Sequence, residues 1–164
     1  MKSITLLSDT HNSLDKRFFS YFEKADEIWH AGDIGSLAIT DKLRKFAPLK
    51  AVWGNIDNQI IRSEFQQTIL FRCEEVNVLM THIGGYPGRY EKKILPIIER
   101  NKPKLFISGH SHILKVIYDQ KYNLLHMNPG AIGNHGIHKV KTLLNFNIEG
   151  KEIKELKVIE FKRE

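Results

Sequence analysis

The chain carries two histidines, His110 and His112, two residues apart and directly after an apolar run that ends in Ser108 and Gly109. Imidazole is the commonest metal ligand in proteins and the usual acid–base group near neutral pH. The glycine beside the pair indicates that another group approaches the backbone closely at this point. The pair by itself identifies no chemistry, so the rest of the chain must supply the groups it works with.

Polar residues of similar kinds follow four other segments that read as strands, in the stretches SDTH, AGDIG, WGNID and MTHIGG. In open α/β sheets, ligands bind at the carboxyl ends of the strands, so these groups are expected to converge on one rim. Each group alone has an ordinary explanation, such as a helix cap or a satisfied histidine, but five such coincidences in one short chain are hard to explain that way. The full set is Asp9, His11, Asp33, Asn55, His82, His110 and His112.

The elements that must position these groups alternate in the first third of the chain. Short β-rich apolar runs are separated by segments whose apolar residues have helical spacing. Ser36 is a candidate N-cap for the second helix. This β-α-β-α-β order predicts parallel strands joined by right-handed crossovers. The predicted strands span residues 3–8, 26–33 and 49–55, and the predicted helices span 14–25 and 36–47.

The second half of the chain predicts strands at 66–73, 76–82 and 104–110 and a helix at 89–101, which Pro96 kinks or bounds. Two hairpins follow, one turning across Asp119 to Tyr122 and one turning at Glu149 and Gly150. Two sheets packed face to face with helices outside fit this order. We expect a single domain over residues 1–164.

Composition narrows the class of protein. The formal net charge of +6 favours anionic partners such as phosphate esters or nucleic acid. No apolar run reaches the roughly 18 residues of a membrane-spanning helix, so no membrane partner is expected. The opening MKSITLLSDTH meets Asp9 and His11 too soon for a signal peptide, and the single Cys73 cannot form an internal disulfide. These features predict a cytoplasmic protein.

Taken in order, SDTH, GDIG, GNID, TH followed by Gly-Gly, and GHSH resemble the five motif blocks of the calcineurin-like metallophosphoesterases. The resemblance is closest to their small, single-domain bacterial and archaeal phosphodiesterase branch, and it extends from about residue 3 to Asn128–Gly130. It implies an α/β fold, a four-layer α/β/β/α sandwich of two mixed β-sheets flanked by helices. It also implies two divalent metal ions. One would be bound by Asp9, His11 and His112, the other by Asn55, His82 and His110, with Asp33 bridging them.

The chemistry explains these residue types. Mixed carboxylate and imidazole ligands suit Mn, Fe, Ni, Co or Zn better than Mg or Ca, and Mn is favoured here. A hydroxide bridging two cations roughly 3.5–4 Å apart is a nucleophile at neutral pH. The resemblance therefore predicts hydrolysis of a small-molecule phosphodiester or phosphomonoester, with Asp33, Asn55 and His82 as catalytic residues.

Two positions depart from the family pattern. Ile56 stands where many relatives have a histidine that is thought to stabilise or protonate the leaving oxygen, so poor alkoxide leaving groups should be expelled less easily than activated aryl ones. Asn12 stands where relatives often have glycine, and asparagine tolerates positive φ better than most residues.

Other polar residues have weaker expectations. Asp57 is expected to orient a ligand or cap a turn. His30 and His126 are interpreted as structural. Two alternatives stay open for the loop histidines His135 and His138. They could face the substrate, or they could be solvent-exposed groups of the loop. Surface charge is favoured over phosphate contact for the candidate cations: Arg62, Arg89 and Lys139.

Two other functions compete with the enzyme. One branch of the superfamily, resembling the retromer scaffold subunit, keeps the fold but has lost metal ligands, whereas all seven positions remain here. The positive charge suggests a nuclease, but the chain has no basic stripe with interleaved aromatics. A monomer and a homo-oligomer are both open, because the edge strand of the last hairpin could pair two subunits or be protected by its Lys and Glu residues.

Overall fold

The first of two five-stranded sheets combines the opening of the chain with its last hairpin. The computed structural model describes all residues, 1–164. Parallel strands β1 (Lys2–Leu7), β2 (Glu27–His30) and β3 (Leu49–Ala51) form one half of this sheet. The antiparallel strands β11 (Val140–Glu149) and β12 (Glu152–Lys162) form the other half, in the order β12-β11-β1-β2-β3.

The second sheet has the order β4-β5-β8-β10-β9. Its central strands β5 (Val76–Thr81), β8 (Leu105–Ile107) and β10 (Leu124–Pro129) are parallel, and antiparallel partners β4 (Thr68–Cys73) and β9 (Leu114–Asp119) lie at its two edges. A small hairpin, β6 (Gly85–Tyr86) with β7 (Arg89–Tyr90), follows β5. Both sheets are mixed, as expected.

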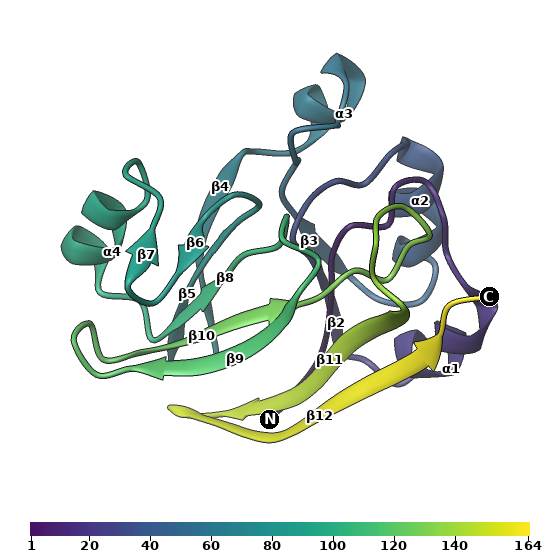
Figure 1. Cartoon of the computed structure of the whole chain (residues 1–164). Coiled ribbons are helices and arrows are strands. Elements are labelled where there is room, and N and C mark those ends of the chain that lie inside the picture. Colours follow the sequence, from purple (N-terminus) through teal and green to yellow (C-terminus); the bar gives the residue numbers. More distant parts are fainter.

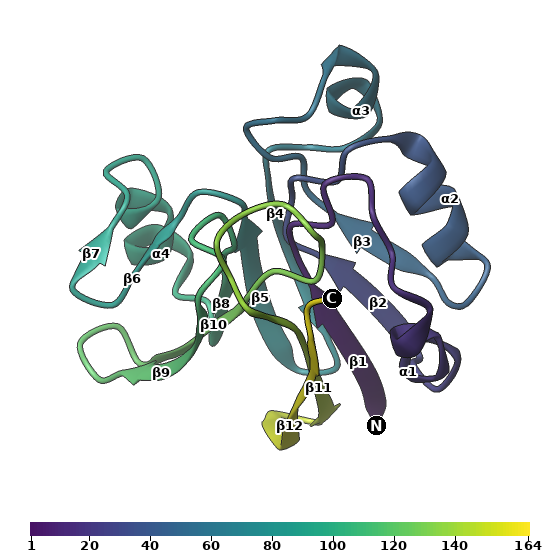
Figure 2. The same ribbon diagram turned by 45° about the vertical axis from the view of Figure 1, so that its right-hand side comes forward.

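Helices cover the outer faces of the two sheets (Figure 1). A short 3-10 helix (Lys16–Phe18), α1 (Phe19–Glu23) and α2 (Leu37–Arg44) lie against the first sheet, and α4 (Leu95–Asn101) lies against the second. The remaining helix, α3 (Gln59–Glu64), stands beyond the strand ends at the top of both ribbon views (Figures 1 and 2). The four-layer α/β/β/α sandwich is therefore confirmed. None of these helices is both long and apolar enough to cross a membrane.

The alternation of side chains along each strand explains the layers. In β2, Ile28 packs with the helices outside the first sheet, while its neighbour Trp29 is buried between the two sheets. Leu6 of the first sheet and Leu105 of the second meet in the same inter-sheet core. This core fixes the two sheets against each other, so their strand ends form a common edge.

Three local expectations need correction. The helix expected at 14–25 consists of the short 3-10 helix and α1, and the helix expected at 89–101 begins only at Leu95. Pro96 lies in the first turn of α4, where its missing N–H costs no intrahelical bond. Helix α3 was not expected; the side chain of Asn58 caps it by accepting the N–H of Ile61. Both hairpins turn where the sequence predicts.

Candidate metal centre

The carboxyl ends of β1, β2, β5 and β8 bring two groups of ligand atoms together. The first group is Asp9, His11 and His112, and the second is Asp33, His82 and His110; within each group the atoms lie within 4.8 Å of one another. Asn55, after β3, joins the second group through Oδ1, which lies 3.1 Å from His110 Nδ1. The structure thus assembles all seven predicted residues in the predicted groups.

Asp33 lies where the two groups meet. Its Oδ2 is 3.3 Å from His11 Nε2 of the first group and 3.2 Å from His82 Nε2 of the second. Asp9 Oδ1 is 3.1 Å from His112 Nε2 and 3.8 Å from His82 Nε2. A carboxylate in the position of Asp33 can contact two cations at once.

Each buried carboxylate has one oxygen that the protein holds and one that faces the centre. Asp9 Oδ2 accepts hydrogen bonds from Ser8 Oγ at 2.6 Å and from the His110 backbone N–H at 3.2 Å, while Oδ1 accepts none. Asp33 Oδ1 accepts the backbone N–H of Ile56 at 3.1 Å, which leaves Oδ2 toward the histidines. The two carboxylates are therefore oriented before any ligand binds.

His82 is oriented in the same way. Its Nδ1 lies 2.7 Å from the carbonyl oxygen of Ala31, which can only accept, so Nδ1 carries the proton. Its Nε2 then presents a lone pair, and this atom is buried without a hydrogen bond, as is His11 Nε2. Buried polar atoms are seldom left unpaired. Here three unpaired buried atoms converge on one point: His82 Nε2, His11 Nε2 and Asp9 Oδ1. This convergence fits a divalent metal site.

Charge coupling within the cluster shifts the pKa values of its members. Burial favours a higher pKa for Asp9, but the neighbouring imidazoles of His11 and His112 outweigh burial and hold it well below its ordinary value. The carboxylate of Asp9 raises the pKa of His11; that of Asp33 raises the pKa of His82 against the opposing effect of burial. Protons and a bound cation would therefore compete for these ligand atoms.

The backbone of the site is strained. Five of the seven residues have left-handed φ angles between 44° and 72°: Asp9, His11, Asp33, His110 and His112. Non-glycine residues adopt this conformation at a cost of about 1–2 kcal/mol each. Asn12 shares it, at φ 65°, in agreement with its expected tolerance. Strain of this kind is concentrated at functional sites, where it aims side chains that a regular strand would turn elsewhere.

Two glycines allow the loops to approach closely. A Cβ on Gly109 would overlap Ser8 Oγ and come within 3.0 Å of Asp9 Oδ2, as the sequence predicts for this glycine. A Cβ on Gly54 would overlap Asp33 Oδ1. Both positions require glycine because the carboxylates pass directly over the backbone.

Asp57 supports the site without facing its centre, as expected. Its carboxylate accepts three backbone N–H groups, from Ile34 at 3.0 Å, Gly35 at 2.9 Å and Gly54 at 2.8 Å. These bonds tie the loop that carries Asp33 to the loop that carries Asn55.

Arg62 holds the same loop from α3, a role that the sequence did not indicate. Its guanidinium stacks 4.1 Å from the centre of the Trp53 ring and donates to the backbone carbonyls of Asp57 at 2.8 Å and Asn55 at 3.2 Å. The sequence does contain one indication of this role. Asn58 is a residue type that caps helices, and a helix starting there carries Arg62.

The loop between β10 and β11 arches over the junction of the two sheets (Figure 2). It carries His135, whose exposed ring stacks on His11 at 4.5 Å, and His138, whose Nε2 donates to the Gly133 carbonyl at 2.8 Å. The His138 ring also packs against the His112 ring, with the ring centres 5.3 Å apart, and His135 faces the site through its contact with His11. Arg163, beyond β12, donates to the carbonyl of Gly136 at 2.6 Å and so anchors this loop.

His30 is fully buried and fully paired. Its Nδ1 accepts the Gly32 N–H at 3.0 Å, so Nε2 carries the proton and donates to Thr10 Oγ1 at 3.0 Å. Burial lowers the pKa of His30 to about 4. Its interpretation as structural agrees with this geometry, whereas His126 lines a cavity.

Comparison with known proteins identifies the family. The sequence model of the calcineurin-like phosphoesterase superfamily domain matches residues 1–151, and the chain belongs to this superfamily. It is 28% identical over 133 residues to a probable metallophosphoesterase of Methanothermobacter thermautotrophicus, covering 78% of this chain and 76% of that protein. A probable metallophosphoesterase of Methanocaldococcus jannaschii is 29% identical, with 78% and 67% covered. The class is therefore that of metal-dependent phosphoesterases.

Solved structures share the fold at low sequence identity. Wild-type Vps29 of Entamoeba histolytica, complexed with Zn²⁺, superposes with a TM-score of 0.76 at 15% identity over 98% of both chains. A structure described as a novel archaeal phosphodiesterase superposes with a TM-score of 0.68 at 21% identity, covering 96% of this chain and 99% of that one.

The support from Asp57 is testable. Asp57→Asn replaces one acceptor oxygen by an N–H₂ group that faces backbone donors, so the loops of Asp33 and Asn55 should loosen. We expect the affinity for Mn²⁺ to fall about 10- to 100-fold in a calorimetric titration. Asp41→Asn, an exposed change on α2, is the matched control and should leave the affinity unchanged. Equal affinities in both variants would contradict the role of Asp57.

The buried His30 predicts a pH dependence. The unfolded chain binds a proton at the ordinary pKa of about 6.5, but the folded chain binds it only near pH 4. The contribution of His30 to the free energy of unfolding should therefore be full above pH 6.5 and fall by roughly 3 kcal/mol as the pH drops toward 4. Ring signals of His30 in an NMR titration should stay in the neutral position from pH 8 to about pH 5.5. A midpoint near 6.5 would refute this.

Proposed function

We propose that this protein hydrolyses phosphodiester bonds with two divalent metal ions, one held by Asp9, His11 and His112 and one by Asn55, His82 and His110. Asp33 would bridge them. The observation that carries the proposal is the convergence of unpaired buried ligand atoms, Asp9 Oδ1, His11 Nε2 and His82 Nε2, around Asp33 Oδ2. Imidazole with carboxylate suits Mn²⁺, Ni²⁺, Fe²⁺, Co²⁺ and Zn²⁺ better than Mg²⁺ or Ca²⁺, and of these we propose Mn²⁺.

Two bound cations would lower the pKa of the attacking water and neutralise charge on the phosphoryl oxygens. The protein would contribute orientation. The Ser8 hydroxyl and the Ile56 N–H hold the outer oxygens of Asp9 and Asp33, so both carboxylates keep their inner oxygens toward the centre. The exposed amide of Asn55 presents oxygen toward His110, and its nitrogen is a donor for a phosphoryl oxygen.

The residue after Asn55 bears on which substrates react. Ile56 is 45% exposed and offers only its backbone N–H, which Asp33 accepts. No side chain at this position can protonate a leaving oxygen. Diesters with activated leaving groups are therefore the expected substrates.

The likeness to Vps29 favours a second candidate, a metal-binding interaction scaffold without catalysis. The fold is shared over nearly the whole chain. Against this candidate stand the complete ligand set and the strained backbone that aims it. Backbone strain lowers the stability of the fold, and it is retained mainly where it orients groups for a function.

Hydrolysis of bis(p-nitrophenyl) phosphate tests the function. Chelator-stripped protein should be inactive, and Mn²⁺ should restore activity. Asp33→Ala should lose at least about a thousandfold in kcat, because it removes the ligand shared by both metals. The matched control Asp41→Ala, on the exposed face of α2, should keep full activity. No hydrolysis with Mn²⁺, Ni²⁺, Co²⁺, Fe²⁺ or Zn²⁺, together with tight metal binding, would favour the scaffold.

The substitution Ile56→His should broaden the range of leaving groups. Position 56 is exposed, so the fold should tolerate the change. A histidine there could protonate the departing oxygen, an effect worth about 10²-fold or more for general acids. We expect the rate ratio between p-nitrophenyl and phenyl leaving groups to shrink relative to the wild type, whereas Ile60→His, at another exposed isoleucine, should not change it. An unchanged ratio in Ile56→His would show that leaving-group protonation does not limit the reaction.

A further inference from the structure

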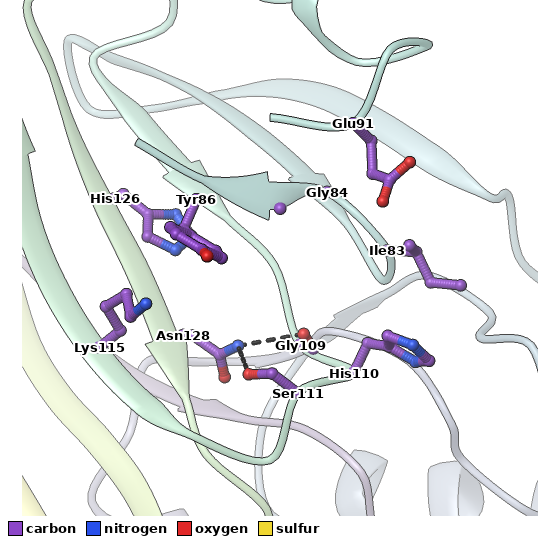
Figure 3. Close-up of a pocket in the computed structure, with 11 residues that line it drawn as sticks. Ile83, Gly84, Tyr86, Glu91, Gly109, His110, Ser111, Lys115, His126 and Asn128 are labelled. Atoms are coloured by element: carbon purple, nitrogen blue, oxygen red, sulfur yellow. Dashed lines mark hydrogen bonds between the residues drawn. The ribbon is translucent and has the colours of Figure 1, made fainter. Parts of the chain in front are cut away.

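A cavity of about 160 Å³ opens beside His110 of the candidate metal centre (Figure 3). Strands β6, β9 and β10 and the loop after β8 form its walls. Its chemistry-bearing side chains are Tyr86, Glu91, His110, Ser111, Lys115 and His126. His110 belongs both to this cavity and to the candidate metal centre, so the two sites adjoin.

His126 forms the inner end of the cavity. It is 1% exposed, and its ring stacks on Phe106 with the ring centres 5.3 Å apart. Its Nδ1 lies 3.1 Å from the Phe106 carbonyl oxygen, so Nδ1 carries the proton and Nε2 is an acceptor. No protein group hydrogen-bonds this Nε2. Burial also lowers the pKa of His126 to about 4, which keeps the ring neutral and the acceptor available at neutral pH.

The other walls offer both donors and acceptors. Ser111 Oγ accepts from Asn128 Nδ2 at 3.1 Å and from the Ile113 N–H at 3.2 Å, so its own hydroxyl proton is free to be donated. The ammonium of Lys115 lies 3.7 Å from the centre of the Tyr86 ring and is held at the side of the cavity. Glu91 adds a carboxylate at the opposite side (Figure 3).

A wholly apolar occupant would leave the polar groups of these walls without partners. An alkyl chain or a plain aryl ring would cover His126 Nε2 without offering it a hydrogen, and a buried acceptor without a partner is unfavourable. A ligand with several O–H or N–H groups would satisfy Nε2 and Glu91 and still accept from Ser111 and Lys115. The volume suits a single small ring.

We propose that this cavity is a substrate subsite for the ester group that stays on the phosphorus, and that it binds a polar ring bearing O–H or N–H donors, such as the sugar or base of a nucleoside. This inference rests on the proposed phosphodiesterase function. His126 acts in it as a specificity-determining residue, through the hydrogen bond that its Nε2 accepts.

Three substrates with the same p-nitrophenol leaving group test the subsite. Thymidine 5′-p-nitrophenyl phosphate carries donors on its retained group, whereas bis(p-nitrophenyl) phosphate and p-nitrophenyl phosphorylcholine carry none. We expect kcat/KM to be highest for the thymidine ester. A preference for the choline ester would show that Glu91 selects a cation, and equal values for the three would show that the cavity takes no part; either result overturns the proposal.

A matched pair of variants isolates Nε2. The amide nitrogen of Asn corresponds to histidine Nδ1, so His126→Asn keeps the bond to Phe106 and leaves nothing at the Nε2 position. His126→Gln places its amide oxygen at the Nε2 position instead. The preference for the thymidine ester should fall roughly tenfold in His126→Asn, as expected for one lost hydrogen bond, and remain in His126→Gln. Equal preference in the wild type and in a folded His126→Asn would overturn the role of His126.

A binding measurement separates this proposal from the proposed function. Thymidine, which has no phosphate, is titrated into the metal-free protein while backbone amide signals are followed by NMR. Shifts confined to the cavity residues, among them Gly109, Ser111 and Lys115, support the subsite even if no diester is hydrolysed. Hydrolysis of bis(p-nitrophenyl) phosphate without such shifts and without a thymidine preference would leave the function standing and overturn the subsite.

Discussion

The position of the Asp33 carboxylate between two sets of imidazoles is the constraint on which the rest of the structure depends. Buried carboxylates with several imidazoles packed this closely around them are unstable unless each group is oriented and its charge is balanced. The surrounding loops meet this need with backbone N–H groups, the Ser8 hydroxyl and the Ala31 carbonyl. Other features of these loops also orient the ligand side chains. They are the strained φ angles, the glycines beneath the carboxylates and the three hydrogen bonds that Asp57 accepts.

The sequence was sufficient to predict that these side chains converge, because the signals for their placement are local. An apolar strand followed at once by Asp or His places that side chain at a sheet edge, and the same pattern at five strands brings them to one edge. The signal for the turn at Glu149–Gly150 is local in the same way, because it depends on adjacent residues. Asp57 could be expected to support the site, although its three particular partners come from loops that only the fold brings together.

What the sequence did not predict depends on contacts between distant segments. In the sequence, Arg62 is interpreted as surface charge. In the structure, α3 places its guanidinium over the Trp53 ring. His126 reads as a strand histidine in the core. Its proximity to Lys115 and Ser111 arises from the pairing of β9 with β10 and from the loop after β8. Helix boundaries were also poorly predicted, because the short helices α1 and α3 depend on packing more than on their own propensity.

Both ligand groups draw on the two sheets. Asp9 and His11 come from the first sheet and His112 from the second, while Asp33 comes from the first and His82 and His110 from the second. A cation in either position would link the two sheets, and in the first group it would join Asp9 and His112, which lie 103 residues apart in the chain. Closing so long a loop restricts the unfolded chain, so the same ion that serves chemistry would also hold the two halves of the molecule in register. Depleting the metal would then cost the protein rigidity at its centre as well as reactivity.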